Sequence, residues 1–304
     1  MRSGALTPRF PDFKHLTIGD RRELHPRLRA YAPITSELTF TNLFIWRGGQ
    51  RYRWSLLDEH LLILALPGDE PTRAHALPPV GPTGRLEVVR RLLDWMDNAG
   101  LRPLIHRADA RLAAELADSE LTVNPIREHF DYLYRRRDLA ELDGAAYETK
   151  RNHINALLRR VEPEYKPLGP EHLMPAKRLS DEWCRMRRCK DELDLVNEWE
   201  AIRELLNHYD ELDLNGAVLF LDGRLKAFTV GERLNENTAV VHIEKGDPEE
   251  RGVYPLINRL FCRNALADRE YVNREQDLGL PGLRRAKQSY RPVELVEKFD
   301  IARA

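Results

Sequence analysis

Alternating and helical spacings of apolar residues predict an α/β arrangement in the first half of the chain. Apolar residues alternate over 52–56 and recur over 60–66, and the polar pair Asp58-Glu59 lies between the two runs, so we expect a β-hairpin. Over 85–98 the apolar residues stand three or four positions apart, which predicts a helix that Gly100 ends. The other expected elements are a helix over 37–46 capped by Ser36, strands over 103–106 and 121–126, and a short helix over 112–116.

In the second half, long helices come before a group of strands. The pattern predicts helices over 148–161, 171–188 and 193–209. Strands over 217–221, 225–230 and 238–243 should then form an antiparallel meander, because Asp222-Gly223 is a strong two-residue hairpin signal. The remaining elements are a helix over 255–267, a strand over 270–273, a helix over 281–288 and a strand over 293–297.

This order of elements is typical of an N-acyltransferase domain, in which a meander passes through one helix into a strand parallel to its third member. Other mixed α/β layers with the same order stay open, because order alone does not fix topology. A chain of 304 residues is long enough for two domains. We therefore expect an α/β (α+β) protein of two domains, 1–140 and 141–304, with mixed central sheets flanked by helices, the second having the element order of an acyltransferase domain. The active site should lie mainly in the second domain, over 147–299.

Charge, cysteine content and hydropathy exclude several classes of protein. A net charge of -1 argues against a general polyanion binder. Cys184, Cys189 and Cys262 lack metal-type spacing, so we expect neither a disulfide framework nor a metal site. No stretch approaches the roughly 20 apolar residues that span a bilayer, and we expect a cytoplasmic protein without an integral membrane segment.

The junction after the third meander strand is a candidate phosphate site. Arg251 and Gly252 precede the expected helix, whose free N–H groups can receive a phosphate of a cofactor. Asp247, Glu249 and Glu250 would oppose an anion there unless they point away. The alternative is a solvated acidic loop beside a helix N-terminus.

Three residues are candidates for proton transfer. Strand alternation predicts that His242 and Glu244 share one face, where either could deprotonate an attacking amine. Glu244 could instead form a structural ion pair with Arg251, Arg274 or Lys287. Tyr290, at the end of the helix over 281–288, could protonate a leaving group, and the alternative for it is a buried packing residue.

Basic clusters raise the question of a large anionic partner. A partner such as tRNA would require several of these clusters on one side of the molecule, whereas solvated helix faces are the usual explanation. The clusters lie at 135–137, 150–151, 159–160 and 185–190.

Several runs together resemble the bacterial family named for the C-terminal domain of phosphatidylglycerol lysyltransferase, from about Phe13 to Phe299. They are SELTFTNLFIWR, FDYLYRRRDLAELDG, KRNHIN, VVHIEKGDPEERGVYPLINRLF and REQDLGLPGLRRAKQSY. The resemblance implies a tandem GNAT-like fold related to Fem-type ligases. It also implies transfer of an activated aminoacyl ester to an amine or hydroxyl, with proton transfer and oxyanion stabilisation but no covalent nucleophile.

The candidate residues and the resemblance together give the leading interpretation of donor, acceptor and site. We expect His242, Glu244 and Tyr290 in catalysis, with aminoacyl-tRNA as the donor and a small molecule, lipid headgroup or peptide as the acceptor. Acetyl-CoA is an alternative donor, although Gly252 is followed by no second glycine of an acetyl-CoA loop. A catalytically inert binding module is the third alternative. The expected donor-binding residues are Arg251, Gly252, Tyr254, Asn258, Arg274 and Lys287.

Overall fold

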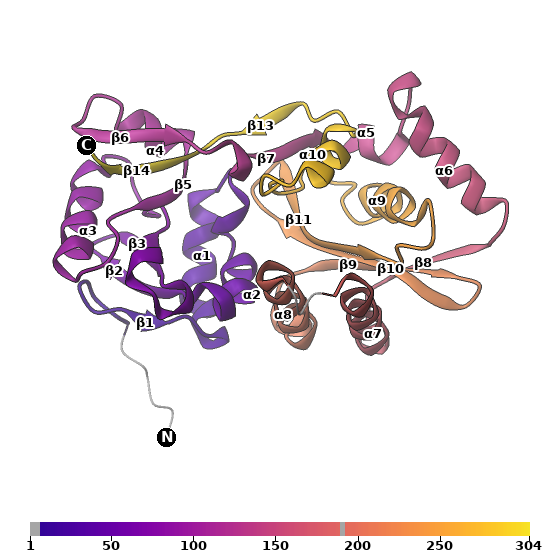
Figure 1. Cartoon of the computed structure of the whole chain (residues 1–304), viewed down its shortest axis with the longest axis horizontal. Coiled ribbons are helices and arrows are strands. Elements are labelled where there is room, and N and C mark those ends of the chain that lie inside the picture. Colours follow the sequence, from indigo (N-terminus) through magenta and orange to yellow (C-terminus); the bar gives the residue numbers. More distant parts are fainter. Residues whose placement is uncertain (1–6, 189–191) are drawn as a thin grey trace. The chain divides into compact units, whose positions relative to one another are not determined.

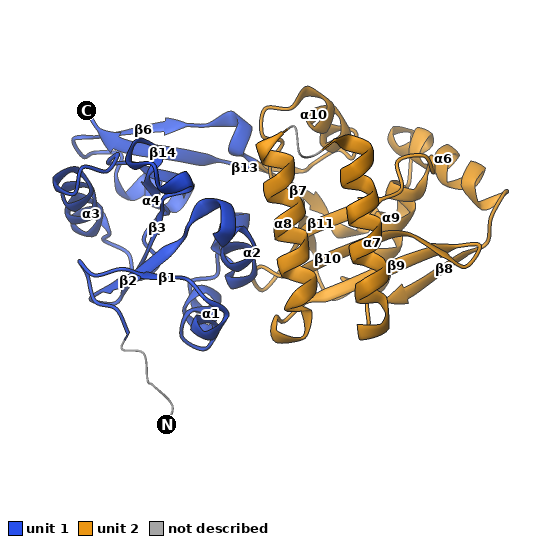
Figure 2. Ribbon diagram, turned by 60° about the horizontal axis from the view of Figure 1, so that its bottom comes forward, with its two compact units in different colours: residues 1–130, 296–304 blue, residues 131–295 orange. Residues whose placement is uncertain are grey.

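The computed structural model describes residues 7–188 and 192–304, which form two compact units (Figures 1 and 2). Unit 1 comprises Met1–Phe130 and Val296–Ala304, and unit 2 comprises Asp131–Leu295. Each unit is built on a mixed sheet of seven strands with helices packed against it. The predicted fold class is therefore confirmed.

The units do not divide at residue 140, where the sequence placed the boundary. Strand β7 (Asp131–Arg135) and helix α5 (Arg136–Glu141) belong to unit 2, because β7 pairs with β12 (Tyr271–Asn273). At the other end of the chain, β14 (Lys298–Arg303) returns to unit 1 and pairs on both edges, with β5 (Ile105–Asp109) and β6 (Leu121–Pro125). Both corrections have one cause. Hydrogen-bonded pairing with strands far away in the sequence decides which unit a strand belongs to, and local periodicity does not predict that pairing.

Unit 1 has the strand order β1-β2-β3-β4-β5-β14-β6. Its β4 and β5 are parallel neighbours, and its other strand pairs are antiparallel. The remaining strands are β1 (Lys14–His15), β2 (Arg53–Leu57), β3 (His60–Ala65) and β4 (His75–Ala76). The α-helices are α1 (Arg21–Tyr31), α2 (Phe40–Gln50), α3 (Leu86–Asn98) and α4 (Ala110–Glu115).

Local sequence explains most of these elements in unit 1. The predicted hairpin is β2 and β3, and Asp58 between them takes a left-handed conformation with φ of 53°. The apolar face of α3 packs into the core of the unit through Val89, Leu92, Leu93 and Met96. The predicted helix over 37–46 begins later, at Phe40, because Thr39 and not Ser36 caps it: the Thr39 hydroxyl accepts a hydrogen bond from the Asn42 N–H at 3.1 Å.

Unit 2 has the strand order β13-β7-β12-β11-β10-β9-β8. Its strands, besides β7 and β12, are β8 (Pro163–Pro167), β9 (Asn215–Leu221), β10 (Arg224–Arg233), β11 (Thr238–Gly246) and β13 (Glu294–Val296). Its helices, besides α5, are α6 (Glu148–Leu158), α7 (Pro170–Arg187), α8 (Leu193–Asn207), α9 (Val253–Asn264) and α10 (Pro281–Gln288). The sequence did not predict β7, β8, α1 or β14, which are short or lack a clear period.

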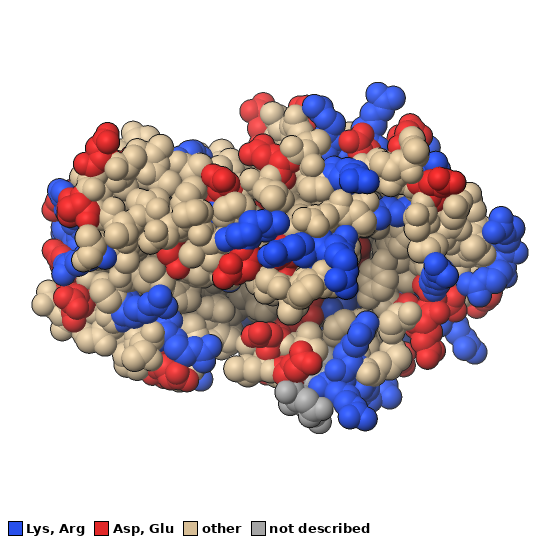
Figure 3. All heavy atoms as spheres, turned by 45° about the horizontal axis from the view of Figure 1, so that its top comes forward, with Lys and Arg blue, Asp and Glu red and all other residues tan. Residues whose placement is uncertain are grey.

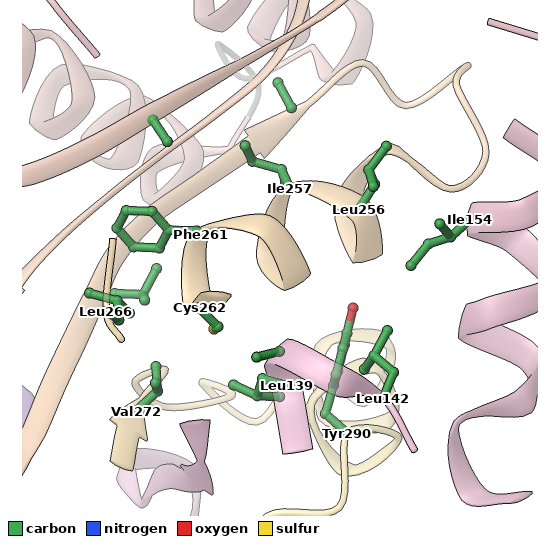
Figure 4. Close-up of a cluster of buried hydrophobic side chains, with 14 of the residues drawn as sticks. Leu139, Leu142, Ile154, Leu256, Ile257, Phe261, Cys262, Leu266, Val272 and Tyr290 are labelled. Carbon is green, nitrogen blue, oxygen red and sulfur yellow. The ribbon is translucent and has the colours of Figure 1, made fainter. Parts of the chain in front are cut away.

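The predicted meander is β9, β10 and β11, joined at its first turn by Asp222 and Gly223, both with positive φ. Helix α9 then leads into β12, which pairs with β11 in parallel, as predicted. Helix α9 buries Leu256, Ile257 and Phe261 in the core of unit 2 (Figure 4). Helices α7 and α8 lie on the opposite face of the sheet (Figure 1). Within the described parts of the chain, no helix has the length and apolar character needed to cross a membrane.

Candidate functional site

Strands β11 and β12 diverge within unit 2. Their parallel pairing covers only Thr238–Val240 of β11, which continues to Gly246 without β12 beside it. In the same region β11 contains a bulge. The consecutive residues Gly231 and Val230 of β10 pair with Val241 and Ile243 of β11, so the pairing skips one residue of β11. A side chain at Gly231 would overlap the carbonyl oxygen of Val240, so glycine is required opposite the bulge.

The bulge places His242 and Glu244 on opposite faces of the sheet, so the predicted shared face is wrong. Glu244 faces α9, where its Oε2 accepts a hydrogen bond from Asn258 Nδ2 at 3.1 Å. His242 faces the other side and contacts Glu232 of β10. Simple alternation fails here because the inserted residue shifts the pattern by one position.

Arg274, directly after β12, is the centre of a buried polar cluster. Its Nη2 lies 2.9 Å from Glu244 Oε1, and the two side chains are only 14% and 11% exposed. Burial lowers the pKa of Arg274, but the Glu244 carboxylate outweighs this effect and raises it above its ordinary value. Asn258 is fully buried, and among the described residues neither its Oδ1 nor Arg274 Nη1 has a hydrogen-bond partner. Two unpartnered atoms in one cluster, an acceptor and a donor, are groups that a polar substrate could satisfy.

Tyr290 follows α10, and its hydroxyl points toward α9 between Leu142 and Cys262 (Figure 4). The Arg274 guanidinium lies 4.7 Å from the centre of the tyrosine ring, and Lys150 Nζ lies 3.9 Å from it. Burial raises the pKa of Tyr290. The phenol is therefore protonated at neutral pH and can donate a proton or a hydrogen bond.

His242 is held on both ring nitrogens by carboxylates. Nδ1 lies 2.9 Å from Glu275 Oε1, Nε2 lies 3.0 Å from Glu232 Oε1, and the side chain is 1% exposed. Burial lowers the pKa of His242, but the two hydrogen bonds outweigh it and raise the pKa to about 9. An imidazolium without a free nitrogen is a poor proton acceptor, so this geometry favours a structural role for His242.

We expect the stability of the protein to fall as pH rises from about 6.5 through 9, because the pKa of His242 is higher in the folded state than its ordinary value of 6.5. The stabilisation is complete below pH 6.5 and is of the order of 3 kcal/mol. The measurement is the free energy of unfolding of the protein and of His242→Gln over this range. Equal pH dependence in both proteins would contradict the assignment.

The other predicted donor-binding residues each have contacts of their own in unit 2. Lys287 donates a hydrogen bond to the backbone oxygen of Arg274, and burial, followed by Arg274, lowers the pKa of Lys287 to about 8. Tyr254 donates to the Gly246 carbonyl at 3.0 Å. Gly252 has φ of 102°, and a Cβ there would lie 2.6 Å from the backbone oxygen of His153. The close approach at Gly252 is thus made by α6.

The acidic loop before α9 is partly neutralised by neighbouring cations. Asp247 pairs with Lys226 at 2.7 Å, and Glu250 pairs with Arg160 at 3.5 Å. Arg251 is exposed, and its Nη2 lies 2.7 Å from His153 Nε2. Two of the three carboxylates that would oppose an anion therefore already have partners.

The basic clusters differ in their surroundings. Acidic and basic side chains are interspersed over the face in Figure 3, as the net charge of -1 suggests. The cluster at 135–137 lines a surface cavity of about 520 Å³ in which carboxylates nearly balance the cations; its lining residues are Arg135, Arg136, Arg137, Asp138, Asp143, Arg269 and Glu270. Of the cluster at 185–190, Cys189 and Lys190 lie outside the described residues.

Cys184 and Cys262 are free thiols.

Sequence reasoning missed Lys150 and Glu232 as neighbours of the candidate residues, having treated Lys150 only as one member of a basic cluster. The sequence signal that could have indicated Lys150 was its position in KRNHIN, one of the runs that carry the family resemblance. No local pattern could show that Glu232 and Glu275 would meet His242, because the three residues lie on different segments.

A meander that leads through one helix into a diverging parallel strand, with polar side chains at the divergence, defines the GNAT-like acyltransferase class. Unit 1 repeats the order with β2, β3, β4, α3 and β5, so the protein is a tandem GNAT-like protein. The chain belongs to the family described as phosphatidylglycerol lysyltransferase, C-terminal, whose model matches residues 28–302. The fold and the family are those of acyl and aminoacyl transferases.

Solved structures agree with this assignment. A conserved protein of unknown function from Bacteroides thetaiotaomicron is 31% identical with a TM-score of 0.88, covering 96% of this chain and 99% of that one. L-PGS from Bacillus licheniformis is 16% identical with a TM-score of 0.59, covering 85% of each chain. FemX is 10% identical with a TM-score of 0.59, covering 95% of this chain and 96% of its own. The last two share the fold, which confirms the predicted likeness to lipid lysyltransferase and Fem-type architecture.

Proposed function

We propose that this protein transfers an aminoacyl group from aminoacyl-tRNA to a hydroxyl or amine acceptor. The observation that carries the proposal is the buried cluster of Arg274, Glu244, Asn258 and Tyr290 where β11 and β12 diverge. It offers a cationic hydrogen-bond donor, a carboxylate, an amide and a protonated phenol around one place. These are the groups that acyl transfer without a covalent nucleophile requires.

The roles follow from the chemistry of the step. The acceptor oxygen or nitrogen forms a bond to the ester carbonyl carbon, the bond from that carbon to the ribose oxygen breaks, and one proton moves from the acceptor to the ribose oxygen. Arg274 Nη1, which has no partner among the described residues, is the candidate donor to the developing oxyanion. Tyr290 is the candidate acid for the leaving oxygen.

Glu244 is the remaining candidate for accepting the proton of the acceptor. It lies on the same side of the sheet as Asn258, and it contacts Arg274 directly. His242 faces the opposite side with both nitrogens bonded, so we do not assign proton transfer to it. Of the proposed phosphate ligands, Arg251 remains exposed and free to meet a donor, whereas Lys287 contacts the backbone of Arg274.

Acetyl-CoA receives less support as the donor. In an acetyl-CoA enzyme a glycine at this junction would let the pyrophosphate approach the backbone, but here the space beside Gly252 is taken by the His153 carbonyl. A phosphatidylglycerol headgroup is the first acceptor to test, because of the family description. A small amine or a peptide is the next.

We expect Tyr290→Phe to slow aminoacyl transfer by at least about 100-fold while the protein stays folded, because the phenolic proton is lost. The assay follows a labelled aminoacyl group from tRNA to phosphatidylglycerol vesicles or to amines, with Tyr147→Phe as the control tyrosine, whose hydroxyl bonds the Tyr290 backbone at 3.0 Å. Turnover of acetyl-CoA alone would replace the proposal with an acetyltransferase. Ligand binding without turnover of any donor would indicate an inert module.

A further inference from the structure

Four basic side chains form a continuous row on unit 2 from Tyr290 to the start of α9. Arg291 follows Tyr290, Lys150 lies over the tyrosine ring at 3.9 Å, and His153 stands one helical turn beyond Lys150 on α6. Arg251 completes this basic row, with its guanidinium 2.7 Å from His153. Lys150 is partly buried, whereas Arg251 and Arg291 are exposed.

In the part of the chain that the structure describes, the cations of the basic row form no ion pairs, although Glu249 and Glu250 directly precede Arg251 in the acidic loop. Within residues 7–188 and 192–304, no carboxylate forms an ion pair with Lys150, Arg251 or Arg291; Lys150 Nζ donates instead to Ser289 Oγ at 2.6 Å. Burial, then Arg274 and Arg291, lower the pKa of Lys150 to about 8. Burial, then Arg251 and Lys150, lower the pKa of His153.

Like charges gathered in this way cost free energy, which a bound anion would relieve. The row also has a direction. It begins beside the phenol of the candidate acid and leads outward to the exposed Arg251. A linear polyanion attached to a reactive ester would place its ester at Tyr290 and its phosphates along α6. A flat surface of lipid headgroups fits less well, because Lys150 is partly buried against the Tyr290 ring.

We infer that the basic row binds the phosphodiester backbone at the 3′ end of the donor RNA. The choice of RNA rests on the proposed function, which requires an aminoacyl-tRNA donor. The row binds the phosphates of the donor electrostatically, and this interaction does not require contacts with the nucleobases.

The test is fluorescence anisotropy with a labelled single-stranded RNA of about 8 nucleotides ending in CCA, measured over a series of salt concentrations. We expect Lys150→Gln, Arg251→Gln and Arg291→Gln each to weaken binding several-fold at low salt. Each should also reduce the slope of log affinity against log salt by about 0.7 for every phosphate that the variant no longer neutralises. Arg178→Gln is the matched control, because Arg178 is an exposed cation on α7, across the sheet.

In the binding assay, the inference would be overturned by no RNA binding to the native protein at low salt, by equal weakening with Arg178→Gln, or by no weakening with any variant of the row. Anionic vesicles are assayed in parallel, and row-dependent binding to vesicles but not to RNA would assign the row to a membrane. The proposed function fails separately. RNA binding through the row without aminoacyl transfer would refute the function alone, whereas undiminished transfer in the row variants would refute the inference alone.

Discussion

Replacing Arg274 with methionine is expected to lower the free energy of unfolding of unit 2 by about 3 to 5 kcal/mol and to reduce aminoacyl transfer by at least about 100-fold. The loss of stability arises because Glu244, 11% exposed, would lose the cationic partner that now lies 2.9 Å away. The loss of transfer arises because the unpartnered Nη1 disappears from the site. Chemical denaturation and the transfer assay measure the two effects separately.

The double variant Arg274→Met with Glu244→Leu is the control that separates these effects. Removing both charges should recover most of the stability, because a buried ion pair contributes little compared with apolar residues of similar size. Transfer should stay low, since both polar groups are gone. If Arg274→Met alone unfolds at the same denaturant concentration as the native protein, the pair is not buried as described and its assigned role is wrong.

Lys298→Met should destabilise unit 1 by a similar amount, about 3 to 5 kcal/mol. Lys298 is fully buried at the start of β14, and its Nζ lies 2.7 Å from Glu37 Oε1. Burial raises the pKa of Glu37, but Lys298 and then Arg107 outweigh it and hold the pKa below its ordinary value. Without Lys298, the nearest cation to the Glu37 carboxylate is Arg107, at the longer distance of 3.3 Å.

Hydrogen exchange of peptides from each unit is the measurement for this variant. Exchange should accelerate in the strands of unit 1, including β5 and β6 on either side of β14, and should change little in β9 and β10 of unit 2. Adding Glu37→Gln to Lys298→Met should restore much of the protection, because the buried charge is removed. Acceleration confined to the last residues of the chain would show that this ion pair does not secure β14.

Much of the fold could be predicted because its elements carry local signals. The Asp222-Gly223 turn and the apolar runs around it were sufficient for the meander, and the spacing of Val89, Leu92, Leu93 and Met96 was sufficient for α3. The start of α2 was predicted less well, because Ser36 and Thr39 are both good caps and only the structure shows which hydroxyl meets a backbone N–H.

The candidate site was predicted only in part, for a physical reason. Glu244, Asn258, Arg274 and Tyr290 were named from the sequence, and the structure brings them together. Their roles remain predictions. His242 was placed with them by alternation, and the bulge in β11 removed it, because one inserted residue reverses which face each later side chain takes.

The sequence by itself determined most helices and strands and the segments that hold the polar residues, because periodicity and turn chemistry act over a few neighbouring positions. The tandem acyltransferase plan came from the resemblance of several runs to a known family. Only the tertiary structure decided that the segment at 298–303 completes the sheet of unit 1, that His242 lies between Glu232 and Glu275, and that Lys150 meets Tyr290. Those outcomes depend on contacts between residues far apart in the chain, and the free energy of such contacts has no local pattern to reveal it.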